Sequence, residues 1–336
     1  MKIIKFDNTK AAQAIEKALP NHKFIDLSGK KEFTYEDIYH IKTCDFMMNY
    51  GTFGSTHPTR QWSPETDKKG DGYERKFAHF EFRNSIANMF AKHFNKPLIV
   101  FESATLSRVK NNYDNRHFKL IQPRFYRMGL GHWVWKHTKW CKPTKGRLEE
   151  KIKEIELYNP SFKIKNIFNH QWKNNKNGYI LILPGLEDDP TSSVPVDKWV
   201  ETSVRKIRKH TNRKIVIKAH PVSKLTYDNL KEIKNLEIYT GKDKTIGDMA
   251  KDTYCGVLDS STSIFQLIEL GIPTFTTQFS FGFPLGNSDL SKIENINYAN
   301  SNNVYNWYND MISTEFTMEE LESPSIISKI EELING

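Results

Sequence analysis

Two short segments in the C-terminal half carry residue types suited to binding an anion. Residues 214–224 read KIVIKAHPVSK, so an alternating apolar strand ends in His220 and Pro221. A histidine with a near-neutral pKa can donate to a phosphate or ribose oxygen. Further along, four hydroxyl residues in a row join a strand to a helix: Ser260, Ser261, Thr262 and Ser263. Hydroxyls and backbone N–H groups at a helix start bind phosphate without a metal, so the two motifs predict a phosphate site.

Each motif also has a simpler structural interpretation. One hydroxyl is enough to cap a helix, and a histidine followed by proline can simply end a strand. Four consecutive hydroxyls exceed what a cap needs, and the two motifs are one crossover apart, so we favour the phosphate interpretation. Lys218 adds a cation close to His220, although alternation along the strand would turn its side chain away.

The elements around these motifs alternate between strands and helices. Strands are predicted at residues 179–184, 214–219, 236–240, 254–259 and 272–277, and helices at 196–210, 245–252 and 261–271. This alternation is typical of a doubly wound parallel sheet. Ligands of such sheets bind beyond the carboxyl ends of the strands, which brings His220 and the serine-rich turn to one edge. Gly185 follows the first of these strands and would let the backbone approach a ligand closely.

The N-terminal half fits a second α/β domain. Strands are predicted at 23–27, 44–51 and 97–103, and one long helix at 73–94. The charged, Asn-rich stretch 149–178 contains no strand signal and is interpreted as the linker. We therefore expect one α/β domain over 1–165 that contains the basic, aromatic-rich region, a second over 176–315, and a C-terminal helix over 316–336 that crosses back.

The segments KAHP and DSSTSIFQLIELGIP resemble the nucleotide-sugar domain of metal-independent glycosyltransferases with the GT-B architecture. The resemblance is to bacterial capsule-type, sialyl- and glycerophosphate-transferring enzymes, and it covers residues 178–277. It implies an α/β fold with two Rossmann-like domains facing a cleft, of which 1–165 would bind the acceptor and 176–315 the nucleotide sugar. It also implies that His220 and Pro221 touch the nucleotide and that the serine-rich turn binds its phosphates. Many members hold the ribose with a glutamate where this chain has Gln266, and Glu269 one turn later is a substitute.

The resemblance implies a nucleotide-sugar donor, with a UDP-sugar as first choice, and no metal. The loop GLEDDP holds acids at 187–189, but they do not form the spaced Asp-x-Asp pair of metal-dependent transferases. Sugar transfer needs a base for the acceptor hydroxyl. Glu102 at the end of a predicted strand is our first candidate, with Asp71 and His57 as rivals. Arg108 nearby would hold a phosphate, although it could instead pair with Glu102 structurally.

The excess positive charge of the chain is concentrated in one aromatic-rich region. The chain carries a net charge of +9, and residues 103–147 hold eleven Lys/Arg against one acid, a net of +10, so the remainder sums to −1. Basic groups interleaved with aromatic rings are typical of nucleic-acid surfaces. A strand with one aromatic core face and one wet basic face is an equally good interpretation. The candidate DNA contacts are Arg124, Arg127, Trp133, Trp135, Lys136, Lys139 and Lys142.

Three functions remain open, from two classes of protein. The first is a phage-type DNA-modifying glycosyltransferase (a hexosyl- or pentosyltransferase) that moves a sugar onto a hydroxymethylated pyrimidine such as hydroxymethylcytosine, flipped out of the duplex. The alternatives are a surface or capsule polysaccharide glycosyltransferase and a non-enzymatic nucleic-acid-binding protein. The start of the chain has no apolar signal segment, and its three cysteines are far apart. We expect a cytoplasmic protein without a membrane partner, located in the host cytoplasm if a phage encodes it.

Overall fold

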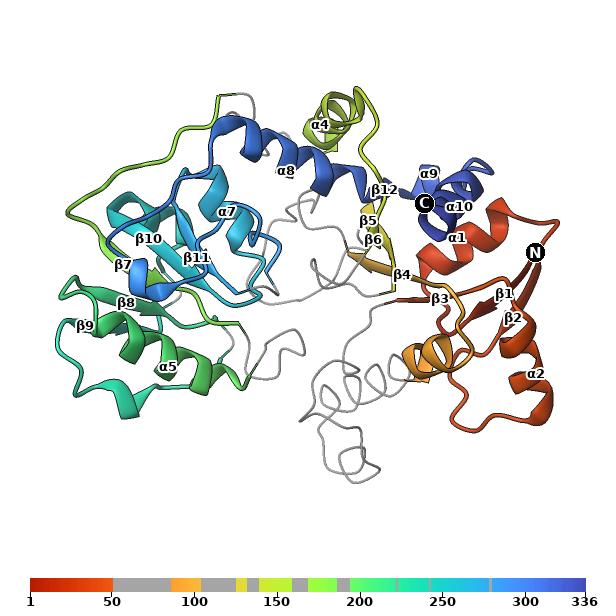
Figure 1. Ribbon diagram of the computed structural model, residues 1–336, viewed down its shortest axis with the longest axis horizontal. Helices are drawn as coiled ribbons and strands as arrows, with labels where there is room; N and C mark the ends of the chain where they lie inside the picture. The colour runs from red at the N-terminus through yellow and green to blue at the C-terminus, as the bar shows by residue number, and fades with distance from the viewer. Residues whose placement is uncertain are drawn as a thin grey trace. The chain divides into compact units, whose positions relative to one another are not determined.

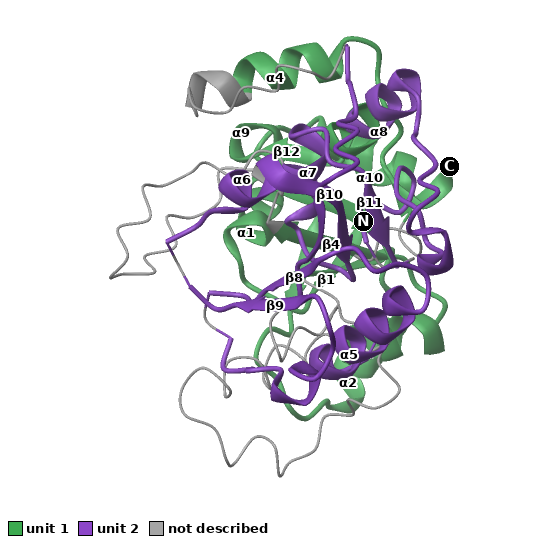
Figure 2. Cartoon of the chain, turned by 90° about the vertical axis from the view of Figure 1, so that its left-hand side faces the viewer, with its two compact units in different colours: residues 1–133, 137–162, 309–336 green, residues 134–136, 163–308 purple. Residues whose placement is uncertain are grey.

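The computed structural model describes residues 1–50, 86–103, 125–131, 139–158, 169–185, 194–221, 223–241, 243–277 and 280–336. The chain divides into two compact units, coloured separately in Figure 2. Unit 1 comprises residues 1–133, 137–162 and 309–336, and unit 2 comprises 134–136 and 163–308. The boundaries predicted from the sequence are 165, 176 and 316.

The described strands of unit 1 form one mixed sheet with the order β12-β5-β4-β3-β1-β2, and β6 pairs with β5. The parallel strands are β1 (Lys2–Lys5), β2 (Lys23–Asp26), β3 (Phe46–Tyr50) and β4 (Leu98–Ser103). Antiparallel to β4 runs β5 (Phe125–Leu130), which also pairs with β6 (Lys139–Trp140) and β12 (Glu315–Thr317). The order reverses between β1 and β3, and such a reversal is where open sheets of this kind bind ligands.

The helices of unit 1 are α1 (Lys10–Ala18), α2 (Tyr35–Thr43), α4 (Arg147–Tyr158), α9 (Met318–Leu321) and α10 (Ile326–Asn335). Residues 86–93 are also helical, and the rest of the long helix predicted over 73–94 lies outside the described residues. The apolar face of α1 packs with α9 and α10 on the sheet residues Ile3, Phe46 and Ile99. Thr9, Thr34 and Thr317 cap the starts of α1, α2 and α9 with their side chains.

The described strands of unit 2 form a parallel sheet (Figure 1). They are β7 (Tyr179–Ile182), β8 (Ile215–Lys218), β9 (Leu236–Tyr239), β10 (Thr253–Leu258) and β11 (Thr274–Thr276), and they lie side by side in the order β11-β10-β7-β8-β9. Numbered along unit 2, this order is 5-4-1-2-3, which is the order of a Rossmann-type sheet. The doubly wound parallel sheet predicted from the sequence is therefore confirmed.

Helices cover both faces of the unit 2 sheet. The apolar stripe of α5 (Val196–Arg208) packs on one face, against Ile180 and Ile215 among others. On the opposite side lies α7 (Ile264–Glu269), visible in Figure 1. Its Leu267 lies so close to Gly256 that a Cβ on this glycine would collide with it. Glycine in β10 thus lets α7 approach the sheet closely.

The described part of unit 2 also contains α6 (Ile246–Met249) and the short turns η3 (Asp228–Leu230) and η5 (Leu290–Lys292). The 3₁₀ turn η4 (Ala250–Asp252) continues α6. The boundary between the two units falls within α8 (Ser301–Ser313). Across the described ranges, no helix combines the length and apolar character that crossing a membrane requires.

Candidate functional site

The carboxyl ends of the five described strands lie along one edge of the unit 2 sheet, because all of them are parallel. The strand order reverses between β7 and β10, so a ligand crevice is expected beyond the ends of these two strands. The ladder between them continues past β7, because the N–H of Leu183 donates to the carbonyl of Val257 at 3.0 Å. Gly185 follows two residues later and is buried at this edge.

His220 lies at the end of β8, next to β7 in the sheet. The preceding residue, Ala219, is buried and continues the ladder through its N–H to the carbonyl of Tyr239 at 3.0 Å. The chain turns immediately afterwards, because the N–H of Ser223 donates to the carbonyl of His220 at 2.9 Å. Both His220 and Pro221 are exposed. The strand therefore presents the imidazole at the carboxyl edge, where a phosphate or ribose oxygen could accept from it.

Lys218 faces a different part of this edge. Its side chain is buried, and its Nζ lies 3.4 Å from the carbonyl oxygen of Gly241 and 5.1 Å from the centre of the Tyr239 ring. Burial lowers the pKa of Lys218, and the charge of Asp243 opposes that effect in part. These contacts direct the ammonium group toward the end of β9, as strand alternation predicts.

The serine-rich turn follows β10 on the other side of the order reversal. Ser260 is buried, Ser261 and Ser263 are half-buried, and Thr262 is exposed. Ser263 occupies the residue before α7, yet its side chain makes no capping hydrogen bond. Instead, the Ser261 hydroxyl accepts from the N–H of Ser263 at 3.3 Å. Capping of α7 by Ser263 thus does not explain the run of hydroxyls.

Two residues at this edge were missed in the sequence. Thr277 follows β11, and its Oγ1 donates to Oδ1 of Asp259, which follows β10, at 2.6 Å. Asp259 is 2% exposed, so this hydrogen bond supplies a partner for a buried carboxylate. The signal available in the sequence was that each residue directly ends a predicted strand.

The two candidate ribose contacts are differently placed on α7. Gln266 is exposed, and Glu269 is half-buried. Burial, followed by the charge of Glu269, raises the pKa of Tyr308, which locates this glutamate near a buried tyrosine. Gln266 is therefore the more accessible of the two.

In unit 1, Glu102 lies in β4 and is half-buried. The phenol of Tyr50, at the end of β3, donates to Oε1 of Glu102 at 3.1 Å. This hydrogen bond orients the carboxylate of the residue predicted to act as the base. The rival bases Asp71 and His57, and the predicted phosphate contact Arg108, lie outside the described residues.

Arg127 is a core residue of unit 1. It is 1% exposed, and its positions directly opposite on the neighbouring strands are Glu102 in β4 and Glu315 in β12. A buried guanidinium requires carboxylates of this kind nearby, and cross-strand positions supply them. Because Arg127 is buried, it cannot contact DNA from the surface as the local charge predicts.

The other candidate DNA contacts are only partly described. Lys139 in β6 is half-buried, and Lys142 is exposed, with its backbone N–H donating to Oε1 of Glu332 at 3.2 Å. Arg124, Trp133, Trp135 and Lys136 lie outside the described residues. Of the predicted DNA contacts, the described residues other than Arg127 are therefore one exposed lysine and one half-buried lysine.

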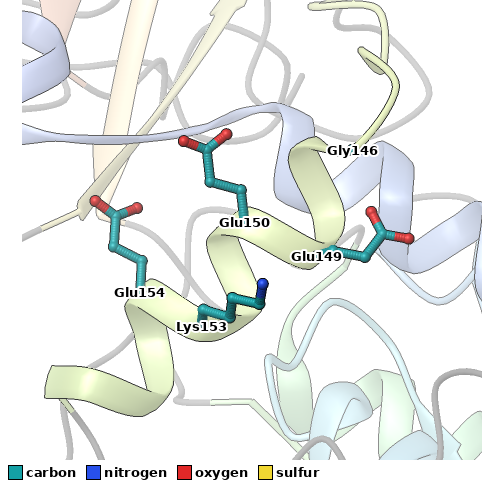
Figure 3. Close-up of a pocket in the computed structure, with 5 residues that line it drawn as sticks. All are labelled: Gly146, Glu149, Glu150, Lys153 and Glu154. Carbon is teal, nitrogen blue, oxygen red and sulfur yellow. The ribbon is translucent and has the colours of Figure 1, made fainter.

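A separate pocket runs along α4 in unit 1 (Figure 3). Its lining residues are Gly146, Glu149, Glu150, Lys153 and Glu154. Three carboxylates against one ammonium group make it unfavourable for a phosphate. Within the described ranges, no group of three or more His, Cys, Asp or Glu side chains could hold a metal ion.

Comparisons with known proteins bear on the fold. No family model matches the chain, and no curated protein sequence matches it. The structure resembles the β-Kdo 2,7 transferase of KpsC from Thermosulfurimonas dismutans, with a TM-score of 0.51 and 14% identity over 99% of this chain and 98% of that chain. It is also similar to the β-Kdo 2,4 transferase of the same organism's KpsC, with a TM-score of 0.47 and 9% identity over 93% and 89% of the two chains.

The first of these two likenesses shows a shared fold, because its score exceeds 0.5 while its identity is low. It extends over nearly the whole of both chains, so it includes both units. Together with the two sheets, it confirms the predicted class: an α/β chain of two Rossmann-like domains with the GT-B architecture.

Proposed function

We propose that this protein is a glycosyltransferase that moves a sugar from a nucleotide-sugar donor onto a bacterial surface or capsule polysaccharide. The observation that carries the proposal is the carboxyl edge of unit 2. There, Gly185, His220 and the serine-rich turn follow the strands on either side of the order reversal. The whole-chain likeness to a Kdo transferase supports the same class of reaction.

The donor nucleotide binds at this edge in our proposal. The hydroxyls of Ser260, Ser261 and Thr262 donate to phosphate oxygens, and the imidazole of His220 donates to a phosphate or ribose oxygen. Gly185 has no side chain to keep the ligand away from the end of β7. The hydrogen bond from Thr277 to Asp259 holds the backbone of the serine-rich turn in place. A UDP-sugar and a nucleotide-activated Kdo are the first donors to test.

Transfer requires a base for the acceptor. The oxygen of the acceptor hydroxyl forms a bond to the anomeric carbon, and the bond from that carbon to the donor phosphate oxygen breaks. The bonding electrons leave with the phosphate, and Glu102 takes the proton of the hydroxyl. The hydrogen bond from Tyr50 fixes one oxygen of Glu102 and leaves the carboxylate oriented for this step.

A glycan is a better-supported acceptor than DNA. The DNA hypothesis depended on the charge and aromatic residues of 103–147, and in that segment Arg127 is buried among cross-strand glutamates. The whole-chain likeness is to a β-Kdo 2,7 transferase, and Kdo is a sugar. The glycan acceptor therefore becomes our main proposal and hydroxymethylated DNA the alternative.

The proposal is tested by incubating the full-length protein with a panel of nucleotide sugars and with two kinds of acceptor, surface-polysaccharide oligosaccharides and hydroxymethylated DNA. Mass spectrometry of the acceptors should show the gain of one sugar on a glycan. A gain on DNA alone would restore the DNA hypothesis. The absence of transfer from every donor, with no nucleotide binding, would refute a glycosyltransferase.

A further inference from the structure

The carboxyl edge of the unit 1 sheet holds a second group of polar side chains. The strand order reverses there between β1 and β3. Asp7 lies two residues beyond β1, Tyr50 ends β3, and Glu102 lies near the end of β4. Because these parallel strands end at the same edge, the three residues are neighbours across it.

The hydrogen bonds of Asp7 do not explain why a carboxylate occupies this buried position. It is 0% exposed, and its Oδ1 accepts from the N–H of Thr9 at 2.9 Å and from its Oγ1 at 2.6 Å. This local turn precedes α1, and asparagine could form it equally well. The second oxygen, Oδ2, is buried and has no hydrogen-bond partner among the residues that the structure describes. Buried carboxylate oxygens are costly to leave unpaired, so the negative charge calls for a functional reason.

Two tyrosines lie near this edge: Tyr50 ends β3, the strand between β1 and β4, and Tyr126 lies in β5 on the other side of β4. The rings of Tyr50 and Tyr126 meet edge to face, with centroids 6.3 Å apart, and the Tyr50 phenol donates to Glu102. Tyr126 is 4% exposed. Burial raises the pKa of Tyr126, and the negative charges of Asp7 and Glu102 raise it further, which places both carboxylates near one phenol.

We propose that Asp7 is a positioning residue for the transfer reaction: its buried negative charge, two strands away in the same sheet, favours uptake of the acceptor proton by Glu102. This inference rests on the proposed function, since it assigns Asp7 to the same reaction. Asp7 itself is buried, so it acts through Glu102 and does not touch the acceptor. The uptake of a proton by Glu102, near the end of β4, would thus depend on a residue that follows β1.

Other charges near the two carboxylates limit the size of the effect. Arg127 on β5 lies across from Glu102, and its positive charge counteracts the negative charge of Asp7. Glu315, across from Arg127 on β12, offsets part of that positive charge. Lys5 on β1 already pairs with Glu16 and Asp26. Asp7 and Glu102 are two strand spacings apart, about 10 Å. At this separation a buried like charge shifts a carboxylate pKa upward by about 0.5–1 unit.

The test compares Asp7→Asn with Asp45→Asn, an exposed aspartate at the amino end of β3 that loses the same charge in the same unit. The measurement is the titration of the Glu102 carboxyl carbon by NMR of protein labelled at glutamate, with the signal assigned by its loss in Glu102→Gln. In Asp7→Asn, the Glu102 carboxyl should titrate about 0.5–1 pH unit lower than in the wild type. Asp45→Asn should leave it unchanged, and an unchanged titration in Asp7→Asn would overturn the proposal.

A kinetic measurement gives a second readout. The acidic limb of the pH profile of kcat/KM should move to lower pH in Asp7→Asn by the same amount, because an ionised Glu102 persists to lower pH. The KM for the donor should stay unchanged. If Asp7→Asn does not fold, the wild-type Glu102 signal should still titrate over a broader pH range than an isolated carboxyl, because the charge of Asp7 changes over the same range. A titration curve as narrow as that of an isolated carboxyl would then contradict the proposal.

The role of Asp7 and the proposed function can be refuted separately. An unaltered Glu102 titration in folded Asp7→Asn refutes the role of Asp7 and leaves glycosyl transfer standing. A wild-type protein that transfers no sugar from any donor refutes the proposed function, and the role of Asp7 with it.

Discussion

Thr277 donates from its Oγ1 to Oδ1 of Asp259 at 2.6 Å, and this hydrogen bond joins the ends of β11 and β10 beside the proposed donor site. Asp259 is buried and immediately precedes the serine-rich turn. The conformation of that turn therefore depends on a hydroxyl that lies 18 residues further along the chain.

Thr277→Val should weaken both the stability of the protein and donor binding. The change removes a hydrogen bond to a buried carboxylate and costs about 1–3 kcal/mol in the free energy of unfolding. Thr226→Val is the matched control, because Thr226 makes the same kind of bond, 2.7 Å to Asp228, at an exposed position. Denaturant unfolding and calorimetric titration with a nucleotide measure the two effects. Equal losses in both variants would contradict the role given to Thr277.

His220→Ala should weaken nucleotide binding and leave the fold intact. The imidazole is exposed at the end of β8, so its loss leaves no cavity. A charge-assisted hydrogen bond to phosphate is worth about 1.5–3 kcal/mol, which corresponds to a loss in affinity of roughly 10- to 150-fold. His210→Ala, another exposed histidine of unit 2, should bind the nucleotide as the wild type does. An unchanged affinity in His220→Ala would remove this residue from the site.

Glu102→Gln should slow the chemical step by roughly 10²–10⁴-fold and leave nucleotide affinity nearly unchanged, because the amide cannot take a proton. Glu315→Gln is its control: Glu315 also lies opposite Arg127, on the other neighbouring strand. Both changes remove a carboxylate beside a buried guanidinium, so both should lower stability. Only Glu102→Gln should lower turnover beyond what its stability explains, as measured by single-turnover kinetics. Equal turnover in the two variants would shift the role of base to Asp71 or His57.

The strands of unit 2 could be predicted from the sequence to within one or two residues at most ends. Strands of a parallel sheet are buried on both faces and read as short apolar runs, such as Ile215–Lys218 and Tyr179–Ile182. The strand-end rule then placed His220 and Ser260 at one edge of the sheet. The local pattern does not show the strand order. It therefore does not show that β10 lies beside β7.

The prediction that Arg127 contacts DNA was wrong for the same reason: the local sequence does not show which strands are neighbours. Local composition predicts a basic surface, because arginine is exposed in most contexts. Arg127 is buried because β5 lies inside the sheet, where its cross-strand positions are Glu102 and Glu315, 25 and 188 residues away in the sequence. Likewise, the hydrogen bond between Thr277 and Asp259, and the unpaired oxygen of Asp7, appear only once the strands are placed together.

The most direct test of the central claim is a crystal structure of the protein with a bound nucleotide. We predict that the phosphates lie beyond the carboxyl ends of β7 and β10, within hydrogen-bond distance of the serine-rich turn, with His220 against the phosphate or ribose. A nucleotide bound elsewhere, for example at the α4 pocket or at the carboxyl edge of unit 1, with this edge of unit 2 unoccupied, would contradict the account.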